Sequence, residues 1–425
     1  MSGEKHTQVK KKPPLWPAAL LLLLAAGIAA GLYLPRLLDG DSEKPTTVSA
    51  QEPLPAEEPP VPPPEPEEPD AIPEPILPPD PAEELLAGMD LWEKVCQLFV
   101  VHPSAITSNV TQAGEEMKKG LEAWPVGGLL LDRSNMVSQE QVRAMLDESQ
   151  GYSKIPLITA CDEEGGRVNR LMETVGTTWV GPMLDYKDQG PETAAENART
   201  IAADLVRCGF NMDFAPVADV WSNPDNTVIG NRAYSDDFSQ AAGLVAAAVE
   251  GFHEGGTACT LKHFPGHGDT SADSHYGSVY VRKTLEELRQ AELLPFCAGI
   301  EAGADAVMMG HLIVEEIDPQ PALLSYKVVT ELLREELGFS GVVITDGLEM
   351  QAMTDHYSSG EIAVGAVLAG VDILLCPVDL KEAAEALVQA AEDGAISMER
   401  LDESVLRVLR LKESRGLLPA AAAAE

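Results

Sequence analysis

Aromatic residues, cysteine and positive charge are all scarce in this chain of 425 residues. Phe, Trp and Tyr make up 5% of it, there are six cysteines, and 68 acidic residues outnumber 30 Lys and Arg for a formal net charge of -38. This acidic balance argues against a nucleic-acid partner, because the phosphate backbone repels an acidic surface. The sequence also lacks a glycine-rich phosphate loop and a Cys/His cluster with zinc spacing. We therefore expect no cofactor, no metal, and a mechanism built from side chains alone.

The amino-terminal part lacks charge in one long stretch. Residues 1–14 form a short basic segment that includes Lys10, Lys11 and Lys12, and residues 15–34 are an uncharged apolar run close to the length that crosses a bilayer. Lysines on its amino side predict a cytoplasmic N-terminus and an extracytoplasmic remainder. Because no cysteine lies in or just after the run, a lipoprotein anchor is excluded. We favour a retained transmembrane segment at the cell membrane, although cleavage near residues 25–31 would give a secreted protein.

Residues 35–82 lack apolar runs and consist mostly of Pro, Glu and Asp. Proline keeps such a segment extended and like charges repel, so it predicts a disordered linker that spaces a domain from the membrane. A Pro-rich ligand for a partner domain is the alternative.

From residue 83 to residue 418, short apolar runs alternate with helix-period segments. We expect strands at 97–101, 127–131, 156–161, 212–217, 258–262, 306–310, 342–345 and 373–376. Expected helices include 194–208, 238–253, 284–302 and 380–391, and a helix at 398–412 that closes the barrel from below. Eight strands with intervening helices predict an α/β fold, a single (β/α)8 TIM-type barrel. Residues 419–425 form an alanine-rich tail, and we expect a monomer.

The six cysteines form an even number, which in an exported protein normally suggests disulfides. Four of them, Cys96, Cys161, Cys259 and Cys376, fall in or beside the expected core strands. Free cysteine behaves there as a small hydrophobe, and a domain of this size needs no covalent cross-links. We therefore predict buried free thiols.

The densest polar stretch is KHFPGHGDTSADSH, residues 262–275, which follows the apolar run 258–261. In parallel α/β folds, chemistry lies where strands end, so this stretch predicts an active-site loop. Asp273 and His275 are two residues apart, close enough for the carboxylate to fix the imidazole tautomer and raise its basicity. His275 is therefore a candidate general acid and base. The alternatives are histidines that bond one another, or an H-x3-H metal site.

A second candidate is Asp346, which ends the expected strand 342–345. At that position a carboxylate points into the barrel mouth, the end of the barrel where the strands finish, and can face a developing oxocarbenium ion. The alternative on position alone is the N-cap of a following helix.

The pattern K-H-F-P-G-H-G-x4-D-S-H resembles the signature of glycoside hydrolase family 3, in its β-N-acetylhexosaminidase branch. The segments DEEGGRVNR at 162–170, GNRAYS at 230–235 and TDGLEM at 345–350 agree with that family in the same order. The resemblance covers roughly residues 85–415 and implies the same barrel fold. It also implies a retaining double displacement on terminal β-linked N-acetylglucosamine, with a glycosyl intermediate on Asp346 and a His275–Asp273 dyad in place of the usual carboxylic acid.

The resemblance further implies a set of substrate-binding residues near the barrel mouth. These are Asp162, Arg170, Arg232, Lys262 and His263. Arg167 is left out as a structural arginine that pairs with Glu163 or Glu164, and His311 is a weaker candidate near the mouth. Thr345 replaces a more usual serine, which affects loop geometry and not the reaction.

Three other functions remain open. A β-glucosidase or β-xylosidase specificity is disfavoured by the intact Asp-x-His dyad, and an N-acetylglucosaminide phosphorylase by a phosphate-poor location. A non-catalytic, membrane-tethered wall-binding protein would have lost Asp346 or His275, and both are present.

Overall fold

The computed structural model describes residues 80–270 and 279–418. Among these residues, no helix combines the length and hydropathy that a membrane span requires. The predicted basic segment, transmembrane segment and alanine-rich tail lie outside the described residues, as does the linker up to residue 79. Helix α2 (Pro81–Ala87) begins one residue before the predicted end of that linker, because Asp80 caps it and Pro81 suits the first helical position.

The strands form a closed ring of parallel pairings. Five of them follow in the order β10, β1, β2, β3, β4, and three in the order β5, β7, β9. The parallel bridge between Met212 and Ala258 joins β4 to β5, and the bridge between Ile344 and Ile373 joins β9 to β10. The strands are β1 (Phe99–Val101), β2 (Gly128–Leu130), β3 (Ile158–Cys161), β4 (Met212–Asp213), β5 (Thr260–Phe264), β7 (Ala306–Met309), β9 (Val342–Thr345) and β10 (Leu374–Leu375). All eight expected strands are present, in an arrangement consistent with a TIM-type barrel.

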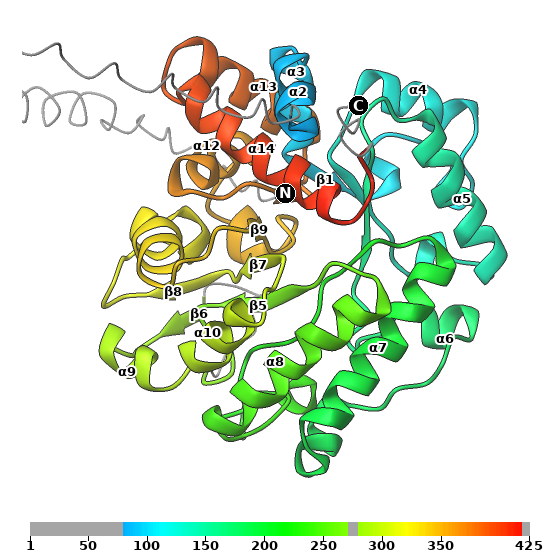
Figure 1. The fold of residues 1–425 in the computed structure, drawn as a ribbon. Coiled ribbons are helices and arrows are strands. Elements are labelled where there is room, and N and C mark those ends of the chain that lie inside the picture. Colours follow the sequence, from blue (N-terminus) through cyan, green and yellow to red (C-terminus); the bar gives the residue numbers. More distant parts are fainter. Residues whose placement is uncertain (1–79, 271–278, 419–425) are drawn as a thin grey trace, which may run out of the picture. The chain divides into compact units, whose positions relative to one another are not determined.

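Helices surround the strands, as Figure 1 shows. The longer ones are α3 (Leu91–Gln97), α4 (Glu115–Ala123), α5 (Gln139–Tyr152), α7 (Pro191–Cys208), α8 (Phe238–Gly255), α9 (Leu285–Gln290), α10 (Leu293–Glu301), α12 (Ser359–Ala369), α13 (Leu380–Glu392) and α14 (Met398–Ser414). Shorter or irregular helices are η1 (Pro103–Ala105), η2 (Arg133–Asn135), α6 (Leu171–Val175), η3 (Met183–Gln189), η4 (Gly230–Arg232), η5 (Ala322–Leu324), η6 (Lys327–Glu336) and α11 (Gln351–Thr354). A small parallel pair of strands, β6 (Val279–Val281) and β8 (Leu312–Val314), was not predicted.

Two predicted boundaries are wrong for identifiable reasons. Strand β5 continues past the predicted end at Lys262 to Phe264, so His263 lies in the strand and not in a loop after it. Its imidazole tolerates this burial because Asp219, which follows β4, is its hydrogen-bond partner. The predicted helix 284–302 is two helices, broken at Ala291. Pro295 explains the break, since its ring clashes with the carbonyl four residues earlier in a continuous helix.

The ring of strands encloses its own apolar core, which contains Phe214, Met308 and Ile344 among other side chains. Helix α14 contributes Val408 and Leu411 to that core. The prediction that a C-terminal helix closes the barrel from below is therefore confirmed. A larger apolar layer lies between the strands and the outer helices.

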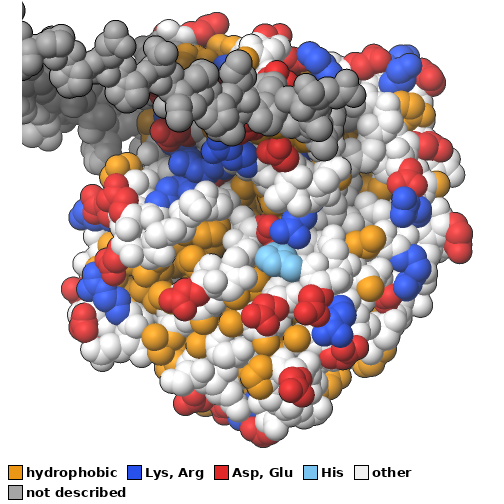
Figure 2. All heavy atoms as spheres, viewed as in Figure 1, with side chains coloured by type: hydrophobic (Ala, Val, Ile, Leu, Met, Phe, Trp, Pro, Cys, Tyr) orange, Lys and Arg blue, Asp and Glu red, His pale blue; other side chains and the backbone are white. Residues whose placement is uncertain are grey.

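All six cysteines are free, and five of them are buried, which confirms the prediction of free thiols for the core positions. Only Cys297 is partly exposed. On the face seen in Figure 2, acidic and basic side chains are interspersed with small apolar areas. This pattern agrees with the many exposed ion pairs, each of which contributes little to stability.

Candidate active site

Asp346 directly follows strand β9 and lines a cavity of about 440 Å³ at the carboxyl ends of the strands. Its backbone N–H donates to the carbonyl of Met309 at 3.0 Å, and its Oδ1 accepts the N–H of Gly347 at 2.8 Å. The alternative of a helix N-cap is wrong, because Met350 is the N-cap of α11. Burial favours the neutral acid, but the imidazoles of His263 and His311 outweigh it and lower the pKa of Asp346. The carboxylate is thus held ionised, as a nucleophile requires.

Lys262 is almost fully buried in strand β5 and bridges two carboxylates. Its Nζ lies 2.7 Å from Asp162 Oδ1 and 2.5 Å from Glu164 Oε1. Burial would lower the pKa of Lys262, but Asp162 and Glu164 more than offset that effect and raise it. The ammonium therefore stays charged beneath the cavity and fixes the orientation of Asp162.

Arg232 forms a bidentate ion pair with Glu164. Its Nε and Nη2 donate to the two carboxylate oxygens at 2.8 Å each. Burial would raise the pKa of Glu164, yet Arg232 and Lys262 hold it far below the usual range. Sequence reasoning missed this role of Glu164, although the double acid in DEEGGR was visible. A buried lysine and a buried arginine together require such a partner.

Arg170 lies at the edge of the same cavity and is about one quarter exposed. Its Nη2 lies 3.4 Å from Asp162 Oδ2, a long contact that leaves donors for another group. The neighbouring Glu163 has a different task, since it accepts the backbone N–H groups of Leu171 and Met172 at the start of α6. Arg167 donates to the carbonyl oxygens of Thr227 and Ile229, and its predicted pairing with Glu163 or Glu164 stays a prediction.

His263 is held by a buried aspartate that sequence reasoning did not identify. Its Nδ1 lies 2.7 Å from Asp219 Oδ2, and the other oxygen, Oδ1, accepts the N–H of His267 at 2.6 Å. Burial would raise the pKa of Asp219, but His263 and His267 lower it. The signal was available, because Asp219 interrupts the apolar run 214–220 after β4. With Nδ1 fixed in this way, His263 can direct Nε2 toward the cavity.

Further residues line the cavity without having been predicted. His267 is one, and its Nδ1 lies 2.8 Å from the hydroxyl of Thr270. Burial lowers the pKa of His267, although the nearby Asp219 opposes this shift. Glu349 is a further carboxylate in the cavity, and burial raises its pKa. His311 positions the turn after β9, since its Nε2 donates to the carbonyl of Gly347 at 2.8 Å.

The structure therefore brings together all the described candidates in one cavity. Asp162, Arg170, Arg232, Lys262, His263 and Asp346 all line it. Asp273 and His275 lie in residues 271–278, outside the described part of the chain, so their roles stay a prediction. A cavity of fixed donors and acceptors with an ionised carboxylate at one wall suits a polar, hydroxyl-rich ligand.

Comparisons with known proteins identify the class. A family model described as the glycosyl hydrolase family 3 N-terminal domain matches residues 90–411. A β-hexosaminidase of Idiomarina loihiensis is 38% identical over 282 residues, which cover 65% of this chain and 84% of the relative. The chain belongs to glycoside hydrolase family 3.

A solved structure and a longer relative are also similar to this chain. A family 3 β-N-acetylglucosaminidase from Paenibacillus sp. str. FPU-7 has 40% identity and a TM-score of 0.74, with 80% of this chain and 65% of that chain covered. The β-hexosaminidase A of Pseudoalteromonas piscicida is 33% identical over 333 residues, or 71% of this chain. The chain spans only 56% of the length of that relative.

Proposed function

We propose that this protein is a retaining exo-β-N-acetylglucosaminidase that removes terminal β-linked N-acetylglucosamine from cell-wall or related glycans. The observation that carries the proposal is the ionised Asp346 at the wall of a cavity whose other polar groups are already fixed by Lys262, Arg232 and Asp219. The names of the relatives support the same substrate class.

In the proposed mechanism, Asp346 attacks the anomeric carbon while His275 protonates the leaving glycosidic oxygen. A covalent glycosyl-aspartate forms, and His275 then deprotonates the water that releases the sugar. Asp273 keeps the imidazole in the required tautomer. Asp162, Arg170, Arg232 and His263 bind hydroxyls of the terminal sugar, with Lys262 holding Asp162 in place.

The test compares aryl N-acetyl-β-glucosaminide with the aryl β-glucoside, and analyses products from chitooligosaccharides and wall fragments. We expect faster turnover of the N-acetylglucosaminide and release of single sugars from the chain end. Faster hydrolysis of the glucoside, or release of internal fragments, would contradict the proposal. Adding phosphate and looking for a sugar 1-phosphate separates hydrolysis from phosphorolysis.

We further propose that the catalytic domain works outside the cytoplasm, tethered by residues 15–34 and set off from the membrane by the Pro/Glu linker. The charge pattern around the apolar run supports this topology.

A further inference from the structure

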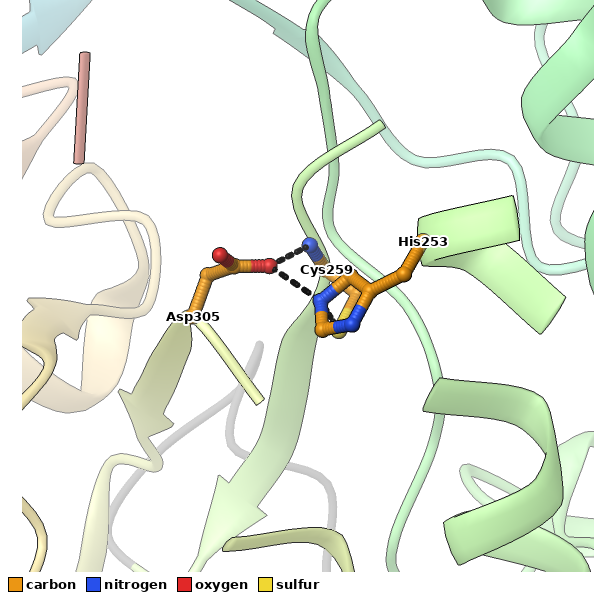
Figure 3. Close-up of side chains that lie close together, drawn as sticks. All are labelled: His253, Cys259 and Asp305. Carbon is orange, nitrogen blue, oxygen red and sulfur yellow. Dashed lines mark hydrogen bonds and ion pairs between the residues drawn. The ribbon is translucent and has the colours of Figure 1, made fainter. Parts of the chain in front are cut away.

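A second cluster of reactive side chains lies at the opposite end of the barrel from the proposed active site. His253 is near the end of α8, Cys259 comes just before β5, and Asp305 comes just before β7. Because the proposed active site is at the carboxyl ends of these strands, residues at their amino ends face the other way. Figure 3 shows the imidazole, the thiol and the carboxylate converging from these three elements.

The spacing of the three side chains is close to that of a tetrahedral metal site. His253 Nε2 lies 2.8 Å from Asp305 Oδ2 and 3.8 Å from Cys259 Sγ, and the three potential ligand atoms all lie within 4.8 Å of one another. Zinc bonds of about 2.0–2.1 Å to nitrogen and oxygen and about 2.3 Å to sulfur place tetrahedral ligands about 3.3–3.6 Å apart. The nitrogen–oxygen pair would have to open by about half an ångström, and the nitrogen–sulfur pair to close by about 0.2 Å, to accommodate the ion.

The three side chains lie in a partly enclosed position. Cys259 is fully buried, and its Sγ faces the ring of His253. Asp305 keeps Oδ2 on the side of His253, because its Oδ1 is held by Arg415 at 2.5 Å. A carboxylate that binds a metal through one oxygen and a hydrogen-bond donor through the other is a common outer-shell arrangement.

The cluster is also accessible. Asp305 lines a second cavity of about 600 Å³, together with Gly303, Ala304 and Ser414. The side chain of His253 is 27% exposed. An ion can therefore approach the cluster from the side of Asp305 and His253.

We propose that His253, Cys259 and Asp305 bind one zinc-type divalent ion, which ties α8 to the first residues of β5 and β7. One nitrogen, one sulfur and one oxygen ligand suit zinc and cobalt better than magnesium or calcium, which prefer oxygen alone. For the metal to bind, the Cys259 thiol releases its proton to solvent, and Nε2 of His253 must present its lone pair, so its proton moves to Nδ1 of the neutral ring or leaves an imidazolium. The site is independent of the proposed glycosidase activity.

The test uses the full chain, stripped with a chelator under reducing conditions and titrated with Co²⁺. We expect a thiolate-to-cobalt charge-transfer band that saturates at one equivalent and disappears when Zn²⁺ displaces cobalt. Saturating Zn²⁺ should also raise the melting temperature by about 2 °C or more. Histidines at the barrel mouth cannot give this band, because it requires a sulfur ligand.

Three variants decide the assignment, each checked for folding by circular dichroism. Cys259→Ser should abolish the band, and His253→Gln should weaken Co²⁺ binding by about tenfold or more. Cys297→Ser is the matched control, a partly exposed cysteine outside the cluster, and should leave the band unchanged. Absence of the band from the wild-type protein, or its survival in Cys259→Ser, would overturn the proposal. If Cys259→Ser fails to fold, an unchanged affinity in His253→Gln would do the same.

Discussion

Asp346 lines the cavity with three other carboxylates, those of Asp162, Glu164 and Glu349. Burial raises the pKa of Glu349, whereas nearby imidazoles lower that of Asp346. Asp162 and Glu164 are already engaged by Lys262 and Arg232, so their charges serve to hold the site in shape. The described geometry thus separates a carboxylate available for chemistry from carboxylates used for positioning. This separation is the basis for the predictions on single residues.

His275→Ala should impair substrates with poor leaving groups by about 10²–10⁴-fold while sparing activated aryl glycosides, since a good leaving group needs little protonation. The variant should accumulate glycosyl-enzyme, and azide, which needs no deprotonation, should partly restore turnover. Asp273→Asn should fall between this variant and the wild type. Asp346→Asn is the control for loss of both steps. Equal impairment on every leaving group, without azide rescue, would show that the roles are wrongly assigned.

Glu164→Gln should lower the free energy of unfolding at pH 7 by about 3–5 kcal/mol, because it leaves Lys262 and Arg232 buried without their shared counter-charge. Denaturant unfolding measures this. The matched control is Glu286→Gln, whose partner Arg289 lies 3.6 Å away on the surface, and which should cost less than about 1 kcal/mol. Equal effects of the two substitutions would contradict the proposed role of Glu164.

The wild type and Glu164→Gln should also differ in how their free energy of unfolding depends on pH. The pKa of Glu164 is lower in the folded state than in the unfolded chain, so its contribution is present above the unfolded value of about 4.3 and is lost as the pH falls toward the folded value. The wild type should therefore lose more stability than Glu164→Gln on acidification below about pH 4.5.

The sequence predicted those site residues whose role can be inferred from their immediate neighbours in the chain. Lys262, His263 and Asp346 stand in a dense polar motif or at the end of an apolar strand. Asp219 and Glu164 were missed because their importance comes from partners that are 44 and 68 residues away in the chain. Such pairings depend on how the strands are ordered around the ring, which residue patterns do not encode locally.

At the level of elements, helix α14 closes the barrel with apolar side chains and also carries a buried lysine. Lys412 is fully buried, and its Nζ donates to Gln97 Oε1 at 2.6 Å. Burial lowers the pKa of Lys412 to about 7. The lysine therefore costs stability in full below about pH 7, and the cost declines as the pH rises from there toward the unfolded value of about 10.4.

Lys412→Met should raise the free energy of unfolding near pH 6, by a net amount of about 1–3 kcal/mol after the loss of the bond to Gln97. In the wild type, stability should rise between about pH 7 and pH 10, since the unfolded chain binds a proton there that the folded state has released. The slope is at most about 1.4 kcal/mol per pH unit, and the difference between the two proteins isolates it. A wild type and variant with parallel pH profiles would contradict this account.

Strands and helices were predictable where a local hydrophobic pattern determines them. Each apolar run that was expected to be a strand is one, because eight such runs at barrel spacing leave few other ways to bury them. The break at Ala291 and the extension of β5 to Phe264 were not foreseen, since one depends on Pro295 four residues later and the other on Asp219, which follows β4. Strands β6 and β8 have three residues each and are too short to show a period.

At the level of the whole molecule, the chain consists of the barrel and a preceding part in which residues 15–34 are predicted to span the membrane. The described domain contains its own core and a complete set of the described cavity residues, so it should remain active when separated from the linker.

Protease added to intact cells should cut within residues 35–79, because their Pro/Glu-rich sequence predicts an extended linker, and release the barrel in active form. The released fraction should hydrolyse aryl N-acetyl-β-glucosaminide at the rate of the full chain, because the linker is not part of the proposed mechanism. A variant with two lysines or arginines placed at the centre of residues 15–34 is the matched control, since charge there opposes membrane insertion. In that variant we expect the enzyme to stay inside the cell and to resist the added protease. Protection of the wild-type barrel until cells are lysed would show that the predicted orientation is wrong.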